Sequence, residues 1–201
     1  MPVRNIRPTF CSATGFVPSK KLGRNVAYES RLERDLIILL EMDYKVSFYE
    51  EQPITINLCC DKRHFRKYTP DFFVRWIDMK SEYIEVKPDK AKMDEEKWRA
   101  MESWCYIKGH SFRVEDANSI RGDVRLKWFD FLHPYLRNPV TESRARHILE
   151  RATQSPSLSV LEFSRKFSFE LSEIYFLMAA GELGYNCSDR PGGSAVVCAN
   201  E

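Results

Sequence analysis

The chain has 201 residues, of which 43% are hydrophobic and 30% are charged, and its formal net charge is +2. This length allows one domain of ordinary size plus a small one, and the composition is that of a soluble globular protein. No apolar run reaches membrane-spanning length and the amino terminus lacks a secretory signal, so we expect a cytoplasmic protein. The six cysteines have no C-x-x-C spacing, which argues against a zinc site or a disulfide framework.

Residues 1–27 contain three prolines, two glycines and no sustained hydrophobic period. The segment also holds five basic residues and no acidic one: Arg4, Arg7, Lys20, Lys21 and Arg24. The sequence therefore predicts a basic arm without regular structure. It is either a loose tail or a segment that follows the phosphate backbone of DNA.

Residues 28–42 form the clearest predicted helix. Ser30 and Glu33 have the S-x-x-E spacing of a capping box, and leucines recur along one face. Glu29 and Glu33 share a face, which solvent exposure or capping would explain. Alternatively, one of them supplies a carboxylate to a metal site, and Glu33 is the better candidate because it lies beside the buried stripe.

Three strands are predicted next, at 46–49, 54–60 and 65–74, and the last of them carries Asp71. The remaining elements of this part are a strand at 83–88, a helix at about 89–108, a strand at 111–114 and a helix at 121–135. This order predicts an α/β fold with a mixed sheet flanked by helices.

A hairpin joins residues 68–74 to residues 83–88 and brings Asp71 near Glu85 and Lys87. Glu85 and Lys87 are two apart, so both project from one face of their strand. Two carboxylates and a lysine at strand ends can bind a hard cation such as Mg²⁺ and aim a water at a phosphate. A surface Glu–Lys ion pair is the alternative, but the upstream Pro-Asp favours the metal site. This Pro-Asp…Glu-x-Lys pattern resembles that of restriction-endonuclease-like nucleases.

The last part of the chain predicts a small separate module after a linker near residue 138. Helices are expected at 141–153, 159–167 and 170–183, followed by short strands at 185–187 and 195–198. Three helices and a hairpin make a winged-helix-like domain. Its third helix is nearly all apolar and has no basic residue, so packing against a partner protein, or burial in a small domain, fits better than insertion into DNA. Six basic against eight acidic residues over 139–201 also favour protein contact.

Four stretches resemble TnsA, the family of endonuclease subunits of heteromeric transposases: Glu29–Asp35, Tyr49–Pro53, Tyr68–Phe72 and Ile84–Pro88. The similarity covers about residues 28–116, and the last module resembles the winged-helix domain of that family more weakly. The organisation that follows is a basic arm at 1–27, a PD-(D/E)xK nuclease domain at 28–137 and a winged-helix-like domain at 138–201. The resemblance implies a bacterial, Mg²⁺-dependent nuclease that cuts the 5′ ends of a transposon, with Mn²⁺ able to substitute.

The resemblance also implies roles and partners. The catalytic set would be Glu33, Asp71, Glu85 and Lys87, and the metal ligands Asp71, Glu85, the Val86 carbonyl and Glu33. The partners would be double-stranded DNA at the transposon ends, a TnsB-type transposase that cuts the 3′ ends, and a TnsC-type ATPase bound by the last module. The alternatives are a stand-alone phage or restriction nuclease and, less favoured, a non-catalytic DNA-binding assembly subunit.

Overall fold

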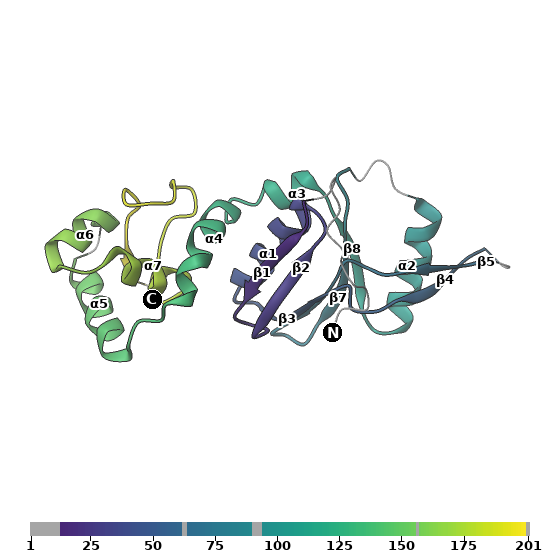
Figure 1. Cartoon of the computed structure of the whole chain (residues 1–201), viewed down its shortest axis with the longest axis horizontal. Coiled ribbons are helices and arrows are strands. Elements are labelled where there is room, and N and C mark those ends of the chain that lie inside the picture. Colours follow the sequence, from purple (N-terminus) through teal and green to yellow (C-terminus); the bar gives the residue numbers. More distant parts are fainter. Residues whose placement is uncertain (1–12, 62–63, 90–93, 156, 200–201) are drawn as a thin grey trace. The chain divides into compact units, whose positions relative to one another are not determined.

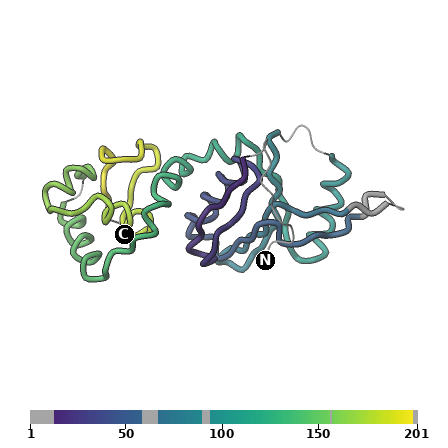
Figure 2. The backbone as a smooth tube through the Cα atoms, in the orientation of Figure 1, coloured from purple at the N-terminus to yellow at the C-terminus, as the bar shows by residue number. Residues whose placement is uncertain are grey.

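The computed structural model describes residues 13–61, 64–89, 94–155 and 157–199. The chain divides into two compact units, Met1–Asp123 and Val124–Glu201, and Figures 1 and 2 trace the backbone of each. The sequence placed the division later, between residues 137 and 138. Within the described ranges, no helix is long and apolar enough to cross a membrane.

The first unit is built on a mixed sheet, which has four strands in the described part of the chain. In spatial order the strands are β3 (Val46–Glu51), β6 (Phe72–Trp76), β7 (Ser81–Val86) and β8 (Ser111–Glu115). β7 and β8 run parallel, and the other neighbours run antiparallel. The helix α2 (Glu95–Ile107) connects the two parallel strands. The predicted α/β fold with a mixed sheet flanked by helices is therefore confirmed (Figure 1).

The helix α1 (Arg31–Met42) begins where the capping pattern predicted. The Ser30 hydroxyl accepts a hydrogen bond from the backbone N–H of Glu33 at 3.1 Å. One face of the helix is almost completely buried, including Leu36, Ile37 and Leu40, and it packs against β3 and the first two strands of the chain. Burying each such side chain contributes about 1.5–3 kcal/mol, so this helix anchors one side of the unit.

The prediction of no regular structure before residue 28 is wrong for the described part of that segment. Strands β1 (Gly15–Ser19) and β2 (Arg24–Tyr28) form an antiparallel hairpin. Gly23 has a φ of +64° at the turn, a conformation that glycine adopts without steric cost. Val17 and Val26 are buried as a pair. Residues 1–12, with Arg4 and Arg7, lie outside the described residues.

A buried carboxylate ties this hairpin to the rest of the unit. Glu41, near the end of α1, is 3% exposed. It accepts hydrogen bonds from the Ser19 hydroxyl at 2.6 Å and from the backbone N–H groups of Lys20 and Lys21 at 2.8 and 3.2 Å. The Tyr49 hydroxyl of β3 donates to the same carboxylate at 2.8 Å. Four donors satisfy the buried charge, which would otherwise be costly.

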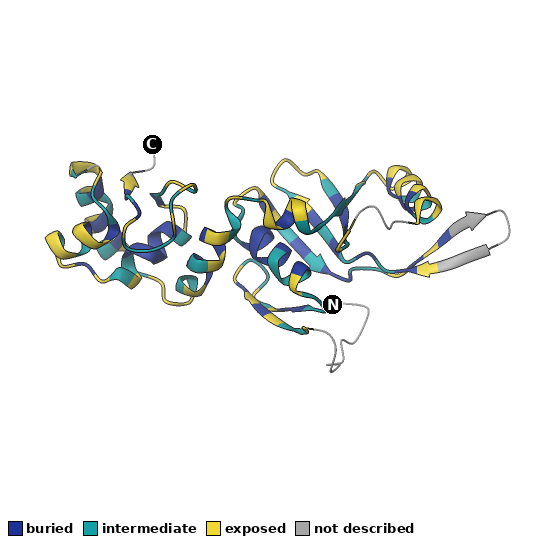
Figure 3. Cartoon of the chain, turned by 90° about the horizontal axis from the view of Figure 1, so that it is seen from above, coloured by how far each residue is buried: buried dark blue, intermediate teal, exposed yellow. Residues whose placement is uncertain are grey.

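Strands β4 (Ile56–Asp61) and β5 (His64–Tyr68) form a separate hairpin that packs against α2. The strand predicted over 65–74 is therefore two strands, and Asp71 lies in the connection before β6 rather than within a strand. Proline cannot donate to a ladder, and Pro70 interrupts the run. A cluster of buried side chains joins the hairpin, α2 and β7: Ile56, Leu58, Tyr68, Tyr83, Trp98, Met101 and Cys105. The sheet strands are mostly buried or half-buried in Figure 3.

The helix predicted over 121–135 is also wrong as a single element. The structure has α3 (Ala117–Arg121), α4 (Leu126–Leu132) and a 3₁₀ helix, η2 (His133–Arg137). Asp116 caps α3, and Gly122 ends it. Val124 is 64% exposed, whereas Trp128 and Leu132 are fully buried.

The second unit contains the three predicted helices, α5 (Glu142–Gln154), α6 (Val160–Phe167) and α7 (Leu171–Ala179). The capping box of Ser159 and Glu162 is confirmed. The last helix is shorter than predicted, and Gly181 has a φ of +77° just beyond it. The strands also differ: β9 (Leu183–Gly184) pairs with β10 (Cys198–Ala199). Residues 174–178 of α7 are buried, which agrees with a helix inside a small domain.

Candidate active site

The strand register brings Asp71 to Glu85. Phe72 of β6 pairs with Ile84 of β7, so the residue before Phe72 and the residue after Ile84 meet at the same end of an antiparallel ladder. The backbone N–H of Val86 donates to Asp71 Oδ2 at 2.7 Å. The ladder therefore fixes the Asp71 carboxylate beside β7, where the sequence pattern placed it.

Residues 51–53, a Glu-Gln-Pro corner at the end of β3, hold the backbone of Asp71. Gln52 has a φ of +43°, and its N–H donates to the Asp71 carbonyl at 2.8 Å. Glu51, in the same corner, accepts two hydrogen bonds from the Arg24 guanidinium at 2.5 and 2.6 Å. A motif distant in sequence from Asp71 thus fixes its position.

Two side chains hold the Glu85 carboxylate. The Tyr68 hydroxyl donates to Oε2 at 2.5 Å, and the Lys87 ammonium forms an ion pair with Oε1 at 2.6 Å. Glu85 is 3% exposed, whereas the Lys87 side chain is 37% exposed. The lysine therefore joins a buried carboxylate to the open part of the site.

Sequence reasoning missed the role of Tyr68. Its ring is buried in the core cluster with side chains of α2 and the sheet, and its hydroxyl reaches the site. Burial and the neighbouring Glu85 raise the pKa of Tyr68, so the phenol stays protonated and acts as a donor. The one feature of the sequence that could have indicated this role is that Tyr68 lies three residues before Asp71, in the Tyr-Thr-Pro-Asp stretch.

The carboxylates of the site repel one another. Burial, followed by repulsion from Glu85 and a smaller contribution from Glu33, raises the pKa of Asp71 to about 8 despite the hydrogen bond from Val86. For Lys87, burial lowers the pKa, but the ion pair with Glu85 outweighs it and the net pKa is raised. Lys87 is therefore an ammonium at neutral pH, and Asp71 is an acid that a nearby cation would deprotonate.

Glu33 interacts electrostatically with Asp71, Glu85 and Lys87, but its hydrogen bonds go to the start of its own helix. Its Oε1 accepts from the Ser30 hydroxyl at 2.9 Å, and its Oε2 accepts from the Glu29 N–H at 2.7 Å. Burial is the main cause that raises its pKa, with a small contribution from Glu85. In the structure its oxygens stabilise the start of α1, and metal binding by Glu33 or Glu29 stays a prediction.

The site lies in a cavity of about 560 Å³ that the predicted residues share with others: Thr55, Lys67, Tyr68, Thr69, Asp71, Glu85, Lys87 and Lys97. Its donors fit Mg²⁺, because carboxylate oxygens are the ligands that this cation prefers and two of them stand together here. In the ranges that the structure describes, no group of three or more Asp, Glu, His or Cys could hold a metal ion. A cation held by Asp71 and Glu85 would therefore take further ligands from the Val86 carbonyl, water or a phosphate.

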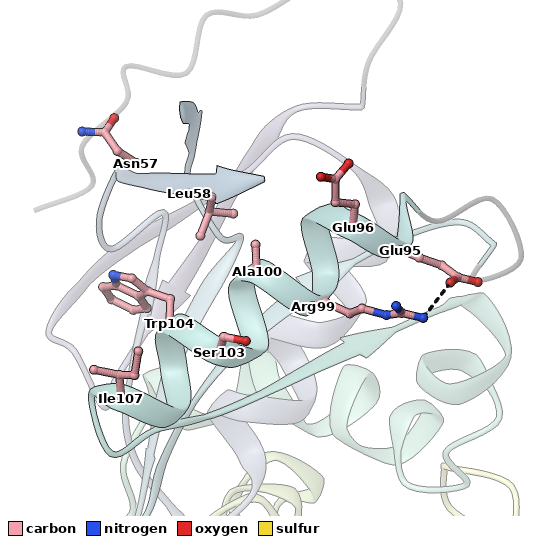
Figure 4. Close-up of a pocket in the computed structure, with 9 residues that line it drawn as sticks. All are labelled: Asn57, Leu58, Glu95, Glu96, Arg99, Ala100, Ser103, Trp104 and Ile107. Carbon is pink, nitrogen blue, oxygen red and sulfur yellow. Dashed lines mark hydrogen bonds and ion pairs between the residues drawn. The ribbon is translucent and has the colours of Figure 1, made fainter. Parts of the chain in front are cut away.

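A second cavity, of about 630 Å³, lies against α2 and lacks this chemistry. Leu58, Ala100, Trp104 and Ile107 line it together with polar residues. Its acidic residues, Glu95 and Glu96, belong to the exposed first turn of the helix, and Figure 4 shows Arg99 paired with one of them, Glu95. This cavity offers no converging carboxylates.

The first unit is thus an α/β domain with two carboxylates and a lysine at the ends of adjacent sheet strands. Residues 43–116 match the family model described as TnsA-like endonuclease N terminal. This part of the chain is therefore similar to the amino-terminal domain of TnsA-like endonucleases, which supports the resemblance found in the sequence. The match covers less than half of the chain, includes Asp71, Glu85 and Lys87, and begins after Glu33. Comparison with curated proteins found no match.

Proposed function

We propose that this protein is the Mg²⁺-dependent endonuclease subunit of a bacterial transposase and cleaves the 5′ ends of a transposon. It would act on double-stranded DNA in concert with a TnsB-type transposase, and Mn²⁺ would substitute for Mg²⁺. The observation that supports the proposal is the convergence of Asp71, Glu85 and Lys87 in one cavity, within the region that matches a TnsA-like endonuclease.

The residues that would hold the cation are Asp71, Glu85 and the carbonyl of Val86, with Glu33 near a second cation. A cation bound there would polarise the scissile phosphate, lower the pKa of an attacking water and offset charge on the leaving 3′ oxygen. Burial beside other carboxylates raises the pKa of Asp71 to about 8, and a cation held there would favour the carboxylate form.

Lys87 would act on the phosphate or on the water. An ammonium has three donors, and one of them is used by Glu85 at 2.6 Å. The others are left for a non-bridging phosphate oxygen or the attacking water, where a fixed positive charge stabilises the charge that develops. Tyr68 would keep Glu85 oriented through its hydroxyl.

The second unit would serve assembly by binding a TnsC-type ATPase. Its longest apolar helix, α7, is largely buried, so the partner would be bound by the polar surface around it. The presence of a separate second unit favours a subunit of a complex over a self-sufficient nuclease. Such a complex would act in the bacterial cytoplasm.

The test is cleavage of transposon-end DNA in the presence of the partner transposase. Asp71→Ala and Lys87→Ala should each abolish 5′-end cutting. Asp78→Ala and Lys80→Ala are matched controls, because these residues form an exposed ion pair at the turn between β6 and β7, and both should cut normally. Undiminished cutting by Asp71→Ala would overturn the proposal.

A further inference from the structure

The cavity of the candidate active site contains two lysines that the proposed chemistry does not use. Lys67 lies near the end of β5, and Lys97 lies in the first turn of α2. Together with Lys87 they give the cavity lining three ammonium groups against two carboxylates. Lys67 and Lys97 therefore make the cavity more positive than it would be with Asp71, Glu85 and Lys87 alone.

Two aromatic rings hold the side chain of Lys97 in place. Its ammonium lies 4.2 Å from the centre of the Tyr68 ring and 5.1 Å from that of the Trp98 ring. Such cation–π contacts fix a cation over an aromatic face and leave its N–H donors available. Tyr68 is also the residue that donates to Glu85, so one ring separates this lysine from a candidate metal ligand.

Lys67 and Lys97 differ from most other cations of the first unit. Many of those have a carboxylate partner: Arg24, Lys80, Lys87, Arg99, Arg113 and Arg121. In the described residues, neither Lys67 nor Lys97 has a carboxylate within ion-pair distance. Their charges are therefore free to attract an anion that enters the cavity.

Two hydroxyls extend the same wall. The side-chain oxygens of Thr55 and Thr69 lie 2.7 Å apart, and both residues line the cavity with the lysines. Hydroxyl groups and lysines are the side chains that commonly contact phosphate oxygens in protein–DNA interfaces.

We propose that Lys67 and Lys97 bind a backbone phosphate of duplex DNA next to the phosphate that is cut. This inference rests on the proposed nuclease function and deepens it. Phosphates of one DNA strand recur about every 3.4 Å along the helix axis. A strand whose scissile phosphate lies at Asp71 and Glu85 therefore places a neighbouring phosphate in the same cavity, beside Lys67 and Lys97. These two residues position DNA and do not touch the reacting atoms.

The first test measures duplex binding over a series of salt concentrations without divalent cations. Lys67→Gln and Lys97→Gln should each make the slope of log K against log[salt] less negative by about 0.9. Lys97→Arg should keep the wild-type slope, because it keeps the charge. Lys108→Gln is the matched control, since Lys108 is exposed at the far end of α2. Wild-type slopes for both glutamine variants would overturn the inference.

A second measurement avoids substitutions that could disturb folding. Acetylation of lysines, read by mass spectrometry, should show that duplex DNA protects Lys67 and Lys97 but not Lys108. Loss of this selectivity, or a wild-type chain without salt-dependent duplex binding, would also overturn the inference. Inorganic phosphate in place of DNA should protect neither lysine at equal phosphate concentration, and equal protection would mean a general anion site instead.

The two proposals fail in distinguishable ways. If Asp71→Ala still cuts DNA, the nuclease assignment is wrong whatever the lysine slopes are. If Asp71→Ala is inactive and the slopes of Lys67→Gln and Lys97→Gln equal that of the wild type, only the phosphate assignment is wrong. In cleavage assays we expect Lys97→Gln to raise KM for DNA more than it lowers kcat.

Discussion

The ion pair between Arg24 and Glu51 connects the amino-terminal hairpin to the candidate site, and breaking it tests whether the hairpin supports that site. Arg24→Ala removes a guanidinium that contacts both oxygens of the Glu51 carboxylate. The carboxylate then stays buried with a backbone N–H, that of Ala27 at 3.3 Å, still beside it. The adjacent Gln52 holds Asp71, so the effect should reach the site.

The magnitude follows from the burial of the two partners. Removing one member of a fully buried pair costs about 3–5 kcal/mol, whereas an exposed pair is worth at most about 1 kcal/mol. The Glu51 side chain is 3% exposed and that of Arg24 is 34% exposed. We therefore expect a loss of about 2–3 kcal/mol in the free energy of unfolding. At roughly 4 °C per kcal/mol for a domain of this size, the Tm should fall by about 8–12 °C.

Urea unfolding of the full chain, followed by circular dichroism, measures this loss. The matched control is Arg99→Ala, which removes an arginine–glutamate pair whose side chains are 79% and 81% exposed, and it should cost about 0.3–0.5 kcal/mol. The double variant Arg24→Leu/Glu51→Leu should recover much of the loss, because no buried charge remains. If Arg24→Ala lowers the free energy of unfolding no more than Arg99→Ala does, the buried ion pair does not have this role.

Further predictions concern Asp71, Tyr68 and the second unit. The pKa of Asp71 in the folded state, about 8, lies above the ordinary 3.8, so its contribution to stability is present below about pH 4 and lost as pH rises through about 8. Asp71→Asn should remove this decline in metal-free urea unfolding and raise stability at pH 8 by about 1–3 kcal/mol; an unchanged pH profile would contradict it. Tyr68→Phe leaves Glu85 short of a donor and should cost about 1–3 kcal/mol and slow cleavage, whereas a fully active variant would show that the hydroxyl has no positioning role. Ser159→Ala removes the cap of α6 and should lower stability of the second unit by about 1 kcal/mol without affecting metal binding, as read by hydrogen exchange and calorimetry.

The sequence predicted the elements whose determinants are local. The N-cap of Ser30, the capping box of Ser159 and the strand that carries Glu85 depend on residues within a few positions of one another, and the structure contains all three. At Ser30 the reciprocal contact differs from the predicted box, because Glu33 accepts from the Glu29 N–H. The hairpin before residue 28 was missed because its partners are distant. Its polar contacts go to Glu41 and Glu51, and no periodicity within the segment indicates them.

The sequence predicted that Asp71 and Glu85 lie together, but it did not predict the contribution of Lys97 or decide the role of Glu33. Asp71 and Glu85 meet because a turn between adjacent strands sets the register, which the polar break in the sequence indicated. Lys97 comes from a helix that only tertiary packing brings to the cavity. For Glu33, the sequence offered capping and metal binding as alternatives, and the hydrogen bonds to Ser30 and Glu29 show the capping contacts.

The buried Glu41 has a consequence for where this nuclease domain can be shortened. The region that matches the family model begins at residue 43, yet three of the four donors to Glu41 come from residues 19–21. In a chain that begins at residue 28, Glu41 would lose these three donors and keep, of the four, the Tyr49 hydroxyl. The buried contacts of the domain thus extend beyond the matched region, and we expect a chain that begins at residue 28 to be less stable than the full chain.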